Sequence, residues 1–266
     1  MRSDLHLHST ASDGLLAPAP LVDALARAGL GACALTDHDT CDGFPAFAAA
    51  AAKAGLFALC GAEVAAAVDG VEVHLLSYFR EPPAGRYADL LARLATERRR
   101  RAERMLGRLW EIGLAVDGEE VLRHPRPGRP HAARAIVAAG GARSVPEAFQ
   151  RFLTPGGPAY VERWRPPAGL VISAARSDGG WTTFAHPCRA QGRPLQALRQ
   201  AGLEAIEVVH PSAGPMERAA LRAEAERYGL LVTGGSDFHG KPDDPPLGSH
   251  ALDAADTRTV LARCGA

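Results

Sequence analysis

The chain has 266 residues, of which 47% are hydrophobic and 23% are charged, a composition typical of a folded globular protein. Its formal net charge is +0 at pH 7, which excludes a global basic field able to hold long nucleic acid non-specifically. We therefore expect no extended nucleic-acid groove, and no membrane segment either, because no apolar run is long enough to span a bilayer.

The N-terminal residues and the cysteines both favour a cytoplasmic location. Residues 1–12 are charged and polar where a signal peptide would carry an apolar stretch. The five cysteines form no C-x-x-C pair, and an odd number argues against a disulfide framework. We expect free thiols in a reducing compartment.

Short apolar runs alternate with amphipathic helical stretches, which predicts an α/β fold with a largely parallel sheet or barrel. The predicted strands are 4–8, 32–36, 57–63, 72–78, 181–185, 205–209 and 230–233. The predicted helices around them are 19–28, 43–53, 194–201, 216–228 and 256–263.

The middle of the chain follows a different pattern. Residues 86–112 have the apolar spacing of one long helix, and 113–168 are rich in Pro, Gly and Arg with two short helices near 130–139 and 146–153. We predict a small helical insertion, 94–167, that covers the active-site mouth of a barrel made of 1–93 and 168–266.

The first predicted strand carries the sequence Asp4-Leu5-His6-Leu7-His8. Because side chains alternate along a strand, His6 and His8 point to one side and form a pair of imidazoles suited to a transition metal. Asp13 follows in a loop before a glycine and can return a carboxylate to the same place. The alternative is a chance pair of histidines on a solvent-facing strand.

Further ligand-type residues recur at or just beyond the C-terminal ends of predicted strands, the face where barrel enzymes assemble their sites. They are His38, Glu63, His74, His186, Asp237 and His239. Imidazoles and carboxylates without thiolates suit Mn, Fe or Zn in a hydrolytic site, where two ions can generate a hydroxide nucleophile. Asp37 or Asp39 could orient His38 as a hydrogen-bond acceptor, although turn formation explains these two residues equally well.

The motifs D-L-H-L-H-S, S-D-G, T-D-H-D, G-x-E, A-H-P and G-S-D-F-H resemble the PHP (polymerase and histidinol phosphatase) family in order and approximate spacing. The resemblance implies a distorted (β/α)7 barrel with a trinuclear metal centre. One ion would take His6, His8, Glu63 and Asp237; a second Glu63, His74 and His186; a third Asp13, His38 and His239. Many family members have His where this chain has Asp13.

Residues 128–134 and 152–161 resemble the PHP subgroup that acts on nucleoside 3′,5′-bisphosphates or on the 5′ ends of short RNA. His131 and Arg134 lie three residues apart and form either a phosphate clamp or a solvated helix face. Tyr160 could stack on a base or act as a packed hinge aromatic, and His210 could line the pocket. The run 98–101 consists of four arginines, for which we favour a solvated face.

These features predict a metal-dependent phosphoesterase that hydrolyses nucleotide phosphates with two or three divalent ions. A metal-bridging hydroxide would attack the phosphorus, and no catalytic residue beyond the metal ligands is expected. The alternatives are a histidinol-phosphate phosphatase, a metal-dependent amidohydrolase and a non-catalytic metal-binding domain. An amidohydrolase would use a carboxylated lysine, but Lys53 and Lys241 do not lie at suitable strand ends.

Overall fold

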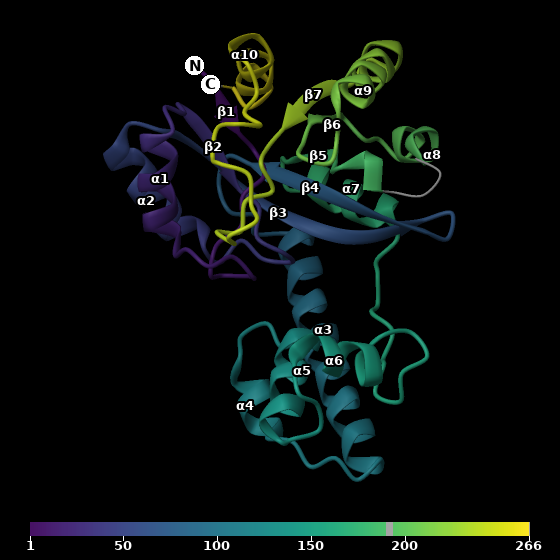
Figure 1. The fold of residues 1–266 in the computed structure, drawn as a ribbon. Coiled ribbons are helices and arrows are strands. Elements are labelled where there is room, and N and C mark those ends of the chain that lie inside the picture. The colour runs from purple at the N-terminus through teal and green to yellow at the C-terminus, as the bar shows by residue number, and fades with distance from the viewer. Residues whose placement is uncertain (190–193, 266) are drawn as a thin grey trace. The chain divides into compact units, whose positions relative to one another are not determined.

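The computed structural model describes residues 1–189 and 194–265 (Figure 1). The chain divides into two compact units, which we call the barrel unit (Met1–Leu90 and Arg165–Ala266) and the insert unit (Leu91–Trp164). In the described part of the chain, every helix is too short or too polar to span a bilayer.

The barrel unit is built on one seven-stranded sheet whose strands follow each other in chain order. The strands are β1 (Ser3–Asp4), β2 (Ala32–Leu35), β3 (Phe57–Val68), β4 (Val71–Phe79), β5 (Trp181–Phe184), β6 (Ala205–Val209) and β7 (Leu231–Gly234). The two outer strands approach each other, since Leu5 N donates to Gly234 O at 3.1 Å and His8 N donates to Phe238 O at 3.0 Å. The sheet is thus a nearly closed barrel, and the predicted fold class is confirmed.

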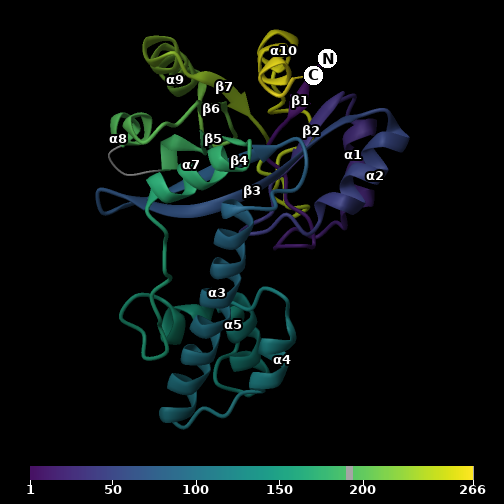
Figure 2. The ribbon, with the colours of Figure 1, turned by 180° about the vertical axis from the view of Figure 1, so that it is seen from behind.

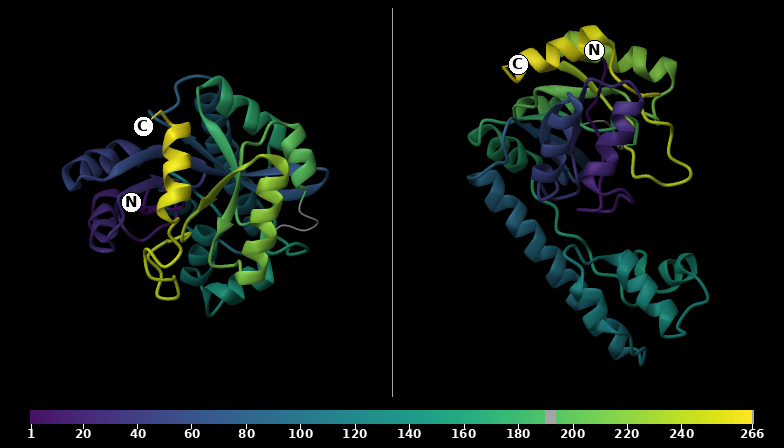
Figure 3. Two further views of the ribbon diagram at one scale, coloured as in Figure 1. Left: turned by 90° about the horizontal axis from the view of Figure 1, so that it is seen from above. Right: turned by 90° about the vertical axis from the view of Figure 1, so that its left-hand side faces the viewer.

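Helices cover the outside of the barrel. Among them, α1 (Pro18–Arg27) and α2 (Phe44–Ala54) pack side by side, and α7 (Ala168–Ser177) lies against β3, β4 and β5 (Figures 1 and 2). In the left-hand view of Figure 3, α9 (Pro215–Tyr228) and α10 (Ala254–Arg263) flank β7. The remaining helix, α8 (Leu195–Gln200), precedes β6.

Proline at the start and glycine at the end mark the boundaries of several of these helices. Both α1 and α9 begin with a proline. Its lack of an N–H costs no hydrogen bond there, because the N–H groups of the first turn have no acceptor within the helix. Gly55 and Gly229 end α2 and α9 in the left-handed conformation, at φ 70° and 64°.

One strand is an exception to the parallel arrangement. The sequence predicts a largely parallel sheet, and four of the six strand pairs are parallel, but β4 is antiparallel to both β3 and β5. The reason is the tight turn Asp69-Gly70, with φ of 50° and 77°, which joins β3 to β4 as a hairpin. As a consequence, the first half of β4 lies at the edge where the parallel strands end.

The insert unit contains the C-terminal part of α3 (Arg86–Glu111) together with α4 (Gly118–Arg123), α5 (Arg129–Ala138), α6 (Val145–Ala148) and a π-helical turn (Phe149–Leu153). Its helices pack along one side of α3 (Figure 3, right). They share a core of small and apolar side chains that includes Ala102, Met105, Leu109, Ala132, Ile136, Ala148 and Leu153.

The predicted elements differ from the structure in two further respects. The first strand is shorter than predicted, because only Ser3–Asp4 pairs as a regular strand and residues 5–8 continue as an extended segment. The sequence analysis also missed α4 and α7: α4 is only 6 residues long, and α7 directly follows Pro167 and has Gly169, a weak helix former, in its first turn.

We predict that Tyr78→Phe lowers the free energy of unfolding by about 1–3 kcal/mol, the range for leaving a buried acceptor without its donor. The buried Tyr78 hydroxyl donates to Leu5 O at 2.8 Å and ties β4 to the segment that follows β1. Urea unfolding followed by circular dichroism measures the change. Tyr228→Phe, on the outer helix α9, should stay within about 0.5 kcal/mol of the unmodified protein; equal effects from both variants would contradict the prediction.

Candidate metal centre

The predicted ligand residues meet at one edge of the barrel. Among the described residues, four groups of donor atoms could each hold an ion, with all atoms of a group within 4.8 Å of one another. Three of them consist of predicted ligands: His6, His8, Glu63 and Asp237; Glu63, His74 and His186; and His8, Asp13, His38 and His239. The fourth consists of His6, Glu207 and His210. All nine residues expected from the sequence are included, and their role as metal ligands stays a prediction.

Glu63 lies where these groups join. Its Oε2 atom is 3.3 Å from His6 Nε2, 3.2 Å from His8 Nε2 and 3.2 Å from His38 Nδ1. Its Oε1 atom is 2.5 Å from His74 Nδ1 and 3.0 Å from His186 Nε2. A single buried carboxylate therefore faces five imidazoles, an arrangement suited to bridging two ions.

The donor geometry of the first group fits a metal ion. His6 Nε2 and His8 Nε2 lie 3.4 and 3.3 Å from Asp237 Oδ1, in addition to their contacts with Glu63. In a tetrahedral site with bonds of about 2.0–2.1 Å, ligand atoms lie about 3.3 Å apart. His8 Nε2 is buried and makes no protein hydrogen bond, as expected of a nitrogen directed at a shared centre.

The electrostatics favour ionised carboxylates. Burial alone would raise the pKa of Glu63, but the neighbouring imidazoles, His38 foremost, hold it well below its usual range. Burial opposes charge on His8 as well, yet Asp237 and Glu63 raise its pKa to about 9. At His38 burial prevails and lowers the pKa to about 4. The carboxylates at the centre are thus kept ionised by cationic neighbours, a role that a bound metal ion would share.

The backbone at two of the predicted ligands is unusual. His186 and Asp237 have positive φ values of 29° and 53°, a conformation that side chains other than glycine rarely adopt. Such residues cluster at functional sites, where the surrounding structure holds them in place. The backbone conformation of His186 is held by a hydrogen bond, in which its N–H donates to Glu207 Oε2 at 2.6 Å.

The sequence analysis missed Glu207. This residue on β6 is fully buried, and its Oε1 atom lies 3.0 Å from His6 Nδ1. The His6 charge is among the causes that keep the pKa of Glu207 low despite burial. Because an ionised carboxylate can only accept, His6 Nδ1 donates its proton to Glu207, and with this proton held in place Nε2 is the nitrogen that would bind a metal ion. The sequence did contain a signal for Glu207, since it is an acidic residue inside an otherwise apolar predicted strand.

Two more buried carboxylates, Asp4 and Asp37, hold the loops that carry ligands. Asp4 Oδ1 accepts from Ser236 N at 3.0 Å, one residue before Asp237. Burial raises the pKa of Asp4 to about 6. Asp37 accepts from Ser9 N and from the Ser9 hydroxyl, both at 2.7 Å. Asp37 therefore braces the loop that leads to Asp13.

The ligand-bearing strands depart from the simple pattern of ligands at strand ends. Glu63 lies in the middle of β3, which continues into the hairpin, and His74 lies in the first half of β4, opposite Ala65. The expectation that both residues end their strands was wrong. His74 still reaches the centre because β4 runs in the opposite direction.

The four predicted substrate contacts fall in two places. His210 is fully buried in the barrel unit, and its Nε2 lies 3.5 Å from Asp237 Oδ2, beside the first ligand group. His131, Arg134 and Tyr160 belong to the insert unit. His131 Nδ1 accepts from Gly128 N at 3.2 Å, so this ring also caps the start of α5.

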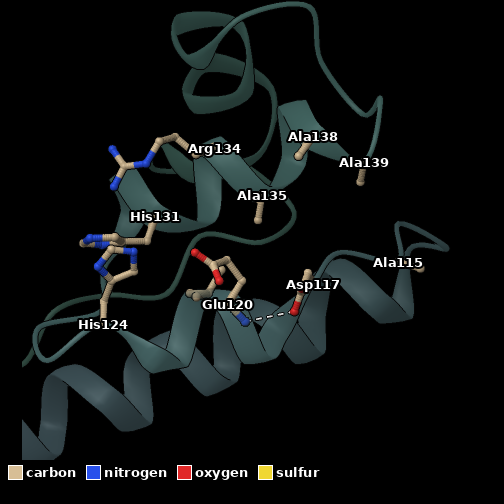
Figure 4. Close-up of a pocket in the computed structure, with 10 residues that line it drawn as sticks. Ala115, Asp117, Glu120, His124, His131, Arg134, Ala135, Ala138 and Ala139 are labelled. Atoms are coloured by element: carbon tan, nitrogen blue, oxygen red, sulfur yellow. Dashed lines mark hydrogen bonds between the residues drawn. The ribbon is translucent and has the colours of Figure 1, made fainter.

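His131 and Arg134 line a cavity of ≈ 480 Å³ within the insert unit (Figure 4). The His131 ring faces that of His124 at 4.0 Å between centroids, and Glu120 lies on the opposite wall. Burial, followed by the charges of His124 and Arg134, lowers the pKa of His131 to about 4. The role of His131, Arg134 and Tyr160 in substrate binding stays a prediction.

A cluster of imidazoles and carboxylates at one edge of a seven-stranded barrel is typical of a metal-dependent hydrolase. Comparison with known proteins narrows the class. Residues 4–106 match the PHP domain. The chain is 34% identical to a 3′,5′-nucleoside bisphosphate phosphatase of Chromobacterium violaceum, over 89% of this chain and 86% of that protein. It is 30% identical to a 5′-3′ exoribonuclease of Haemophilus influenzae, over 89% of each.

A solved structure agrees with these relatives. A Bifidobacterium adolescentis protein, proposed to be a metal-dependent phosphoesterase, superimposes with a TM-score of 0.84 at 33% identity, covering 98% of this chain and 96% of that one. The chain belongs to the PHP family. The predicted family and the predicted enzyme class, a metal-dependent phosphoesterase, are confirmed.

We predict that Glu63→Gln abolishes binding of at least one metal ion per chain, because the neutral amide removes the charge shared by the first two ligand groups. Metal content after dialysis, measured by inductively coupled plasma mass spectrometry, gives the result. Glu226→Gln on the outer face of α9 is the matched control and should keep the full content. An unchanged metal content in Glu63→Gln would show that this carboxylate is not a ligand.

We further predict that Glu207→Gln weakens metal affinity by about 10–100-fold, the usual effect of losing a carboxylate that orients a ligand histidine. Competition with a chelator of known affinity measures the change. Glu204→Gln, whose carboxylate pairs instead with Arg263 at 2.8 Å, should have unchanged affinity. The assigned role of Glu207 would be contradicted if only Glu204→Gln lost metal affinity, or if neither variant lost it.

Proposed function

We propose that this phosphoesterase hydrolyses phosphate esters of nucleotides, either nucleoside 3′,5′-bisphosphates or the 5′ ends of short RNA, with two or three divalent ions of Mn, Fe or Zn. The observation that carries the proposal is the meeting of three ligand groups around Glu63. The names of the relatives from Chromobacterium violaceum and Haemophilus influenzae support a nucleotide substrate.

The residues of the candidate centre fall into two sets, the metal ligands and the residues that orient those ligands. When bound, divalent ions lower the pKa of water to near neutrality and stabilise charge on phosphate oxygens. His6, His8 and Asp237 would hold the first ion with Glu63, while Glu207 accepts from His6 Nδ1 and so orients its ring. The 52% exposed side chain of Asp13 makes the third group the most accessible to solvent.

Substrate recognition is assigned to the insert unit. Arg134 offers a planar set of donors that matches the oxygens of a phosphate, and the neutral His131 beside it offers Nε2 as a further contact. Tyr160 would contribute an aromatic surface for a base. These three assignments extend the resemblance of residues 128–134 and 152–161 to the nucleotide-acting PHP subgroup.

We predict that the manganese-loaded protein releases phosphate from 3′-phosphoadenosine 5′-phosphate or mononucleotides from a 5′-phosphorylated RNA oligomer, at least 100-fold faster than Asp237→Ala. The reason is that Asp237 contacts both histidines of the first group. Steady-state assays with both substrates and with histidinol phosphate, side by side, measure the outcome.

The three substrates separate the alternatives. Turnover of the bisphosphate alone defines a phosphatase, and shortening of the oligomer defines an exonuclease. If only histidinol phosphate reacts, the metal centre stands and the nucleotide assignment is wrong. If no phosphate ester reacts although metals are bound, the amidohydrolase or binding-domain alternative is favoured.

A further inference from the structure

His210 lies beside the candidate metal centre without belonging to any of the three groups of predicted ligands. It directly follows β6, and its ring is close to two predicted ligand rings, 6.0 Å from His6 and 5.3 Å from His186 between centroids. With 0% exposure, the side chain is not accessible to a substrate in this conformation. Any effect of His210 on the reaction therefore passes through a neighbouring side chain.

The hydrogen bonds of the His210 ring fix the position of its proton. Nδ1 accepts from the backbone N–H of Ser212 at 3.0 Å. Because a backbone nitrogen can only donate, Nδ1 carries no proton, and the Ser212 hydroxyl, 2.7 Å away, can donate to it as well. The neutral ring therefore has its proton on Nε2, which makes Nε2 a donor.

This donor faces Asp237. Nε2 lies 3.5 Å from Asp237 Oδ2, and in the part of the chain that the structure describes it is buried without a hydrogen bond of regular geometry. Buried N–H groups are rarely left without an acceptor, and this carboxylate oxygen is in place to serve as one. The other oxygen, Asp237 Oδ1, faces His6 and His8 at 3.4 and 3.3 Å. The two oxygens of Asp237 are thus divided between the first ligand group and His210.

The loop that carries His210 is held by Arg218, near the start of α9. Arg218 Nη2 donates to His210 O at 3.1 Å, and Arg218 Nε donates to Ala213 O at 2.9 Å. The backbone N–H of Ala213 donates to the same His210 carbonyl at 3.0 Å. The imidazole is therefore mounted on a braced segment, as is needed for a side chain that sets the position of another.

The fourth group of donor atoms, His6, Glu207 and His210, offers another role for His210, as a metal ligand. The hydrogen bonds argue against this role. His6 contacts Glu207 through Nδ1, at 3.0 Å, while its Nε2 faces the first ligand group. An ion in the fourth group would replace the proton between His6 and Glu207, and His6 would then have to bind two ions through both ring nitrogens.

We propose that His210 is a positioning residue whose Nε2–H donates to Asp237 Oδ2, so that Asp237 offers only Oδ1 to the first ion. The inference rests on the proposed function, because it assumes that the first ligand group holds an ion. A carboxylate held in this way occupies one coordination position and not two, and a catalytic metal site needs an open position. The end of β6 then supports two ligands, His6 through Glu207 and Asp237 through His210.

The test compares His210→Asn with His210→Gln, because each amide replaces a different half of the ring. The shorter Asn side chain keeps an acceptor near the position of Nδ1 for Ser212 and leaves no donor for Asp237. The longer Gln side chain keeps a donor near the position of Nε2 and loses the contact with Ser212. A residue that only supports its loop depends on the acceptor, whereas a positioning residue depends on the donor.

The manganese affinity of the full chain is measured by competition with a chelator of known affinity, and the binding step that Asp237→Ala weakens identifies the first ion. We expect His210→Asn to weaken this step at least about tenfold, and His210→Gln to recover most of the loss. His210→Asn combined with Asp237→Ala should bind no more weakly than Asp237→Ala alone, because the two residues act as a unit. The control is His250→Gln, whose Nδ1 contacts the neighbouring Ser249 at 2.9 Å and which should keep full affinity.

Circular dichroism melting curves show whether each variant is folded. Should His210→Asn not fold, His210→Phe takes its place, since it keeps a ring without either nitrogen. The same loss of affinity, recovered by His210→Gln, is expected of it.

The outcomes separate this proposal from the proposed function. A loss in His210→Gln but not in His210→Asn overturns the positioning role, since His210 would then only support its loop. Losses in both that add to the loss from Asp237→Ala overturn it too, and make His210 a ligand. If neither loses affinity while Asp237→Ala does, His210 has no such role and the metal centre stands. If Asp237→Ala itself keeps full affinity, the proposed first ion is wrong and the positioning role with it.

Discussion

The structure of this protein depends on a buried carboxylate surrounded by imidazoles. Glu63 has 1% exposure and faces five histidines, and its charge is acceptable in that position only because these partners compensate for lost hydration. Around it, Glu207, Asp4 and Asp37 each hold a ligand or a ligand-bearing loop in place. The barrel supplies the rigid strands from which these groups project.

Much of this arrangement follows from sequence alone. The alternation in Asp4–His8 correctly predicts two imidazoles on one side, and the apolar runs of β2 and β5 correctly predict buried strands. The direction of β4 could not be predicted from periodicity, since a strand of either direction has the same alternation. The turn Asp69-Gly70 did contain that information, because this dipeptide is a hairpin signal.

The residues that support the ligands are harder to predict. Glu207 lies inside an apolar strand and not at its end, so a search for ligands at strand ends passes over it. Net charge conceals a second feature, because the sum over the chain is zero while the insert unit is strongly basic. Only the division into units shows where this positive charge lies.

The sources of the ligands also determine when the centre can exist during synthesis on the ribosome. His6 and His8 are made more than two hundred residues before Asp237 and His239, with the whole insert unit in between. Closure of the barrel through Leu5 and Gly234 has the same long separation. Such distant contacts form slowly. The nascent chain therefore contains the histidine pair long before the residues that complete the candidate site, so binding of a metal ion there would be a late step of its maturation.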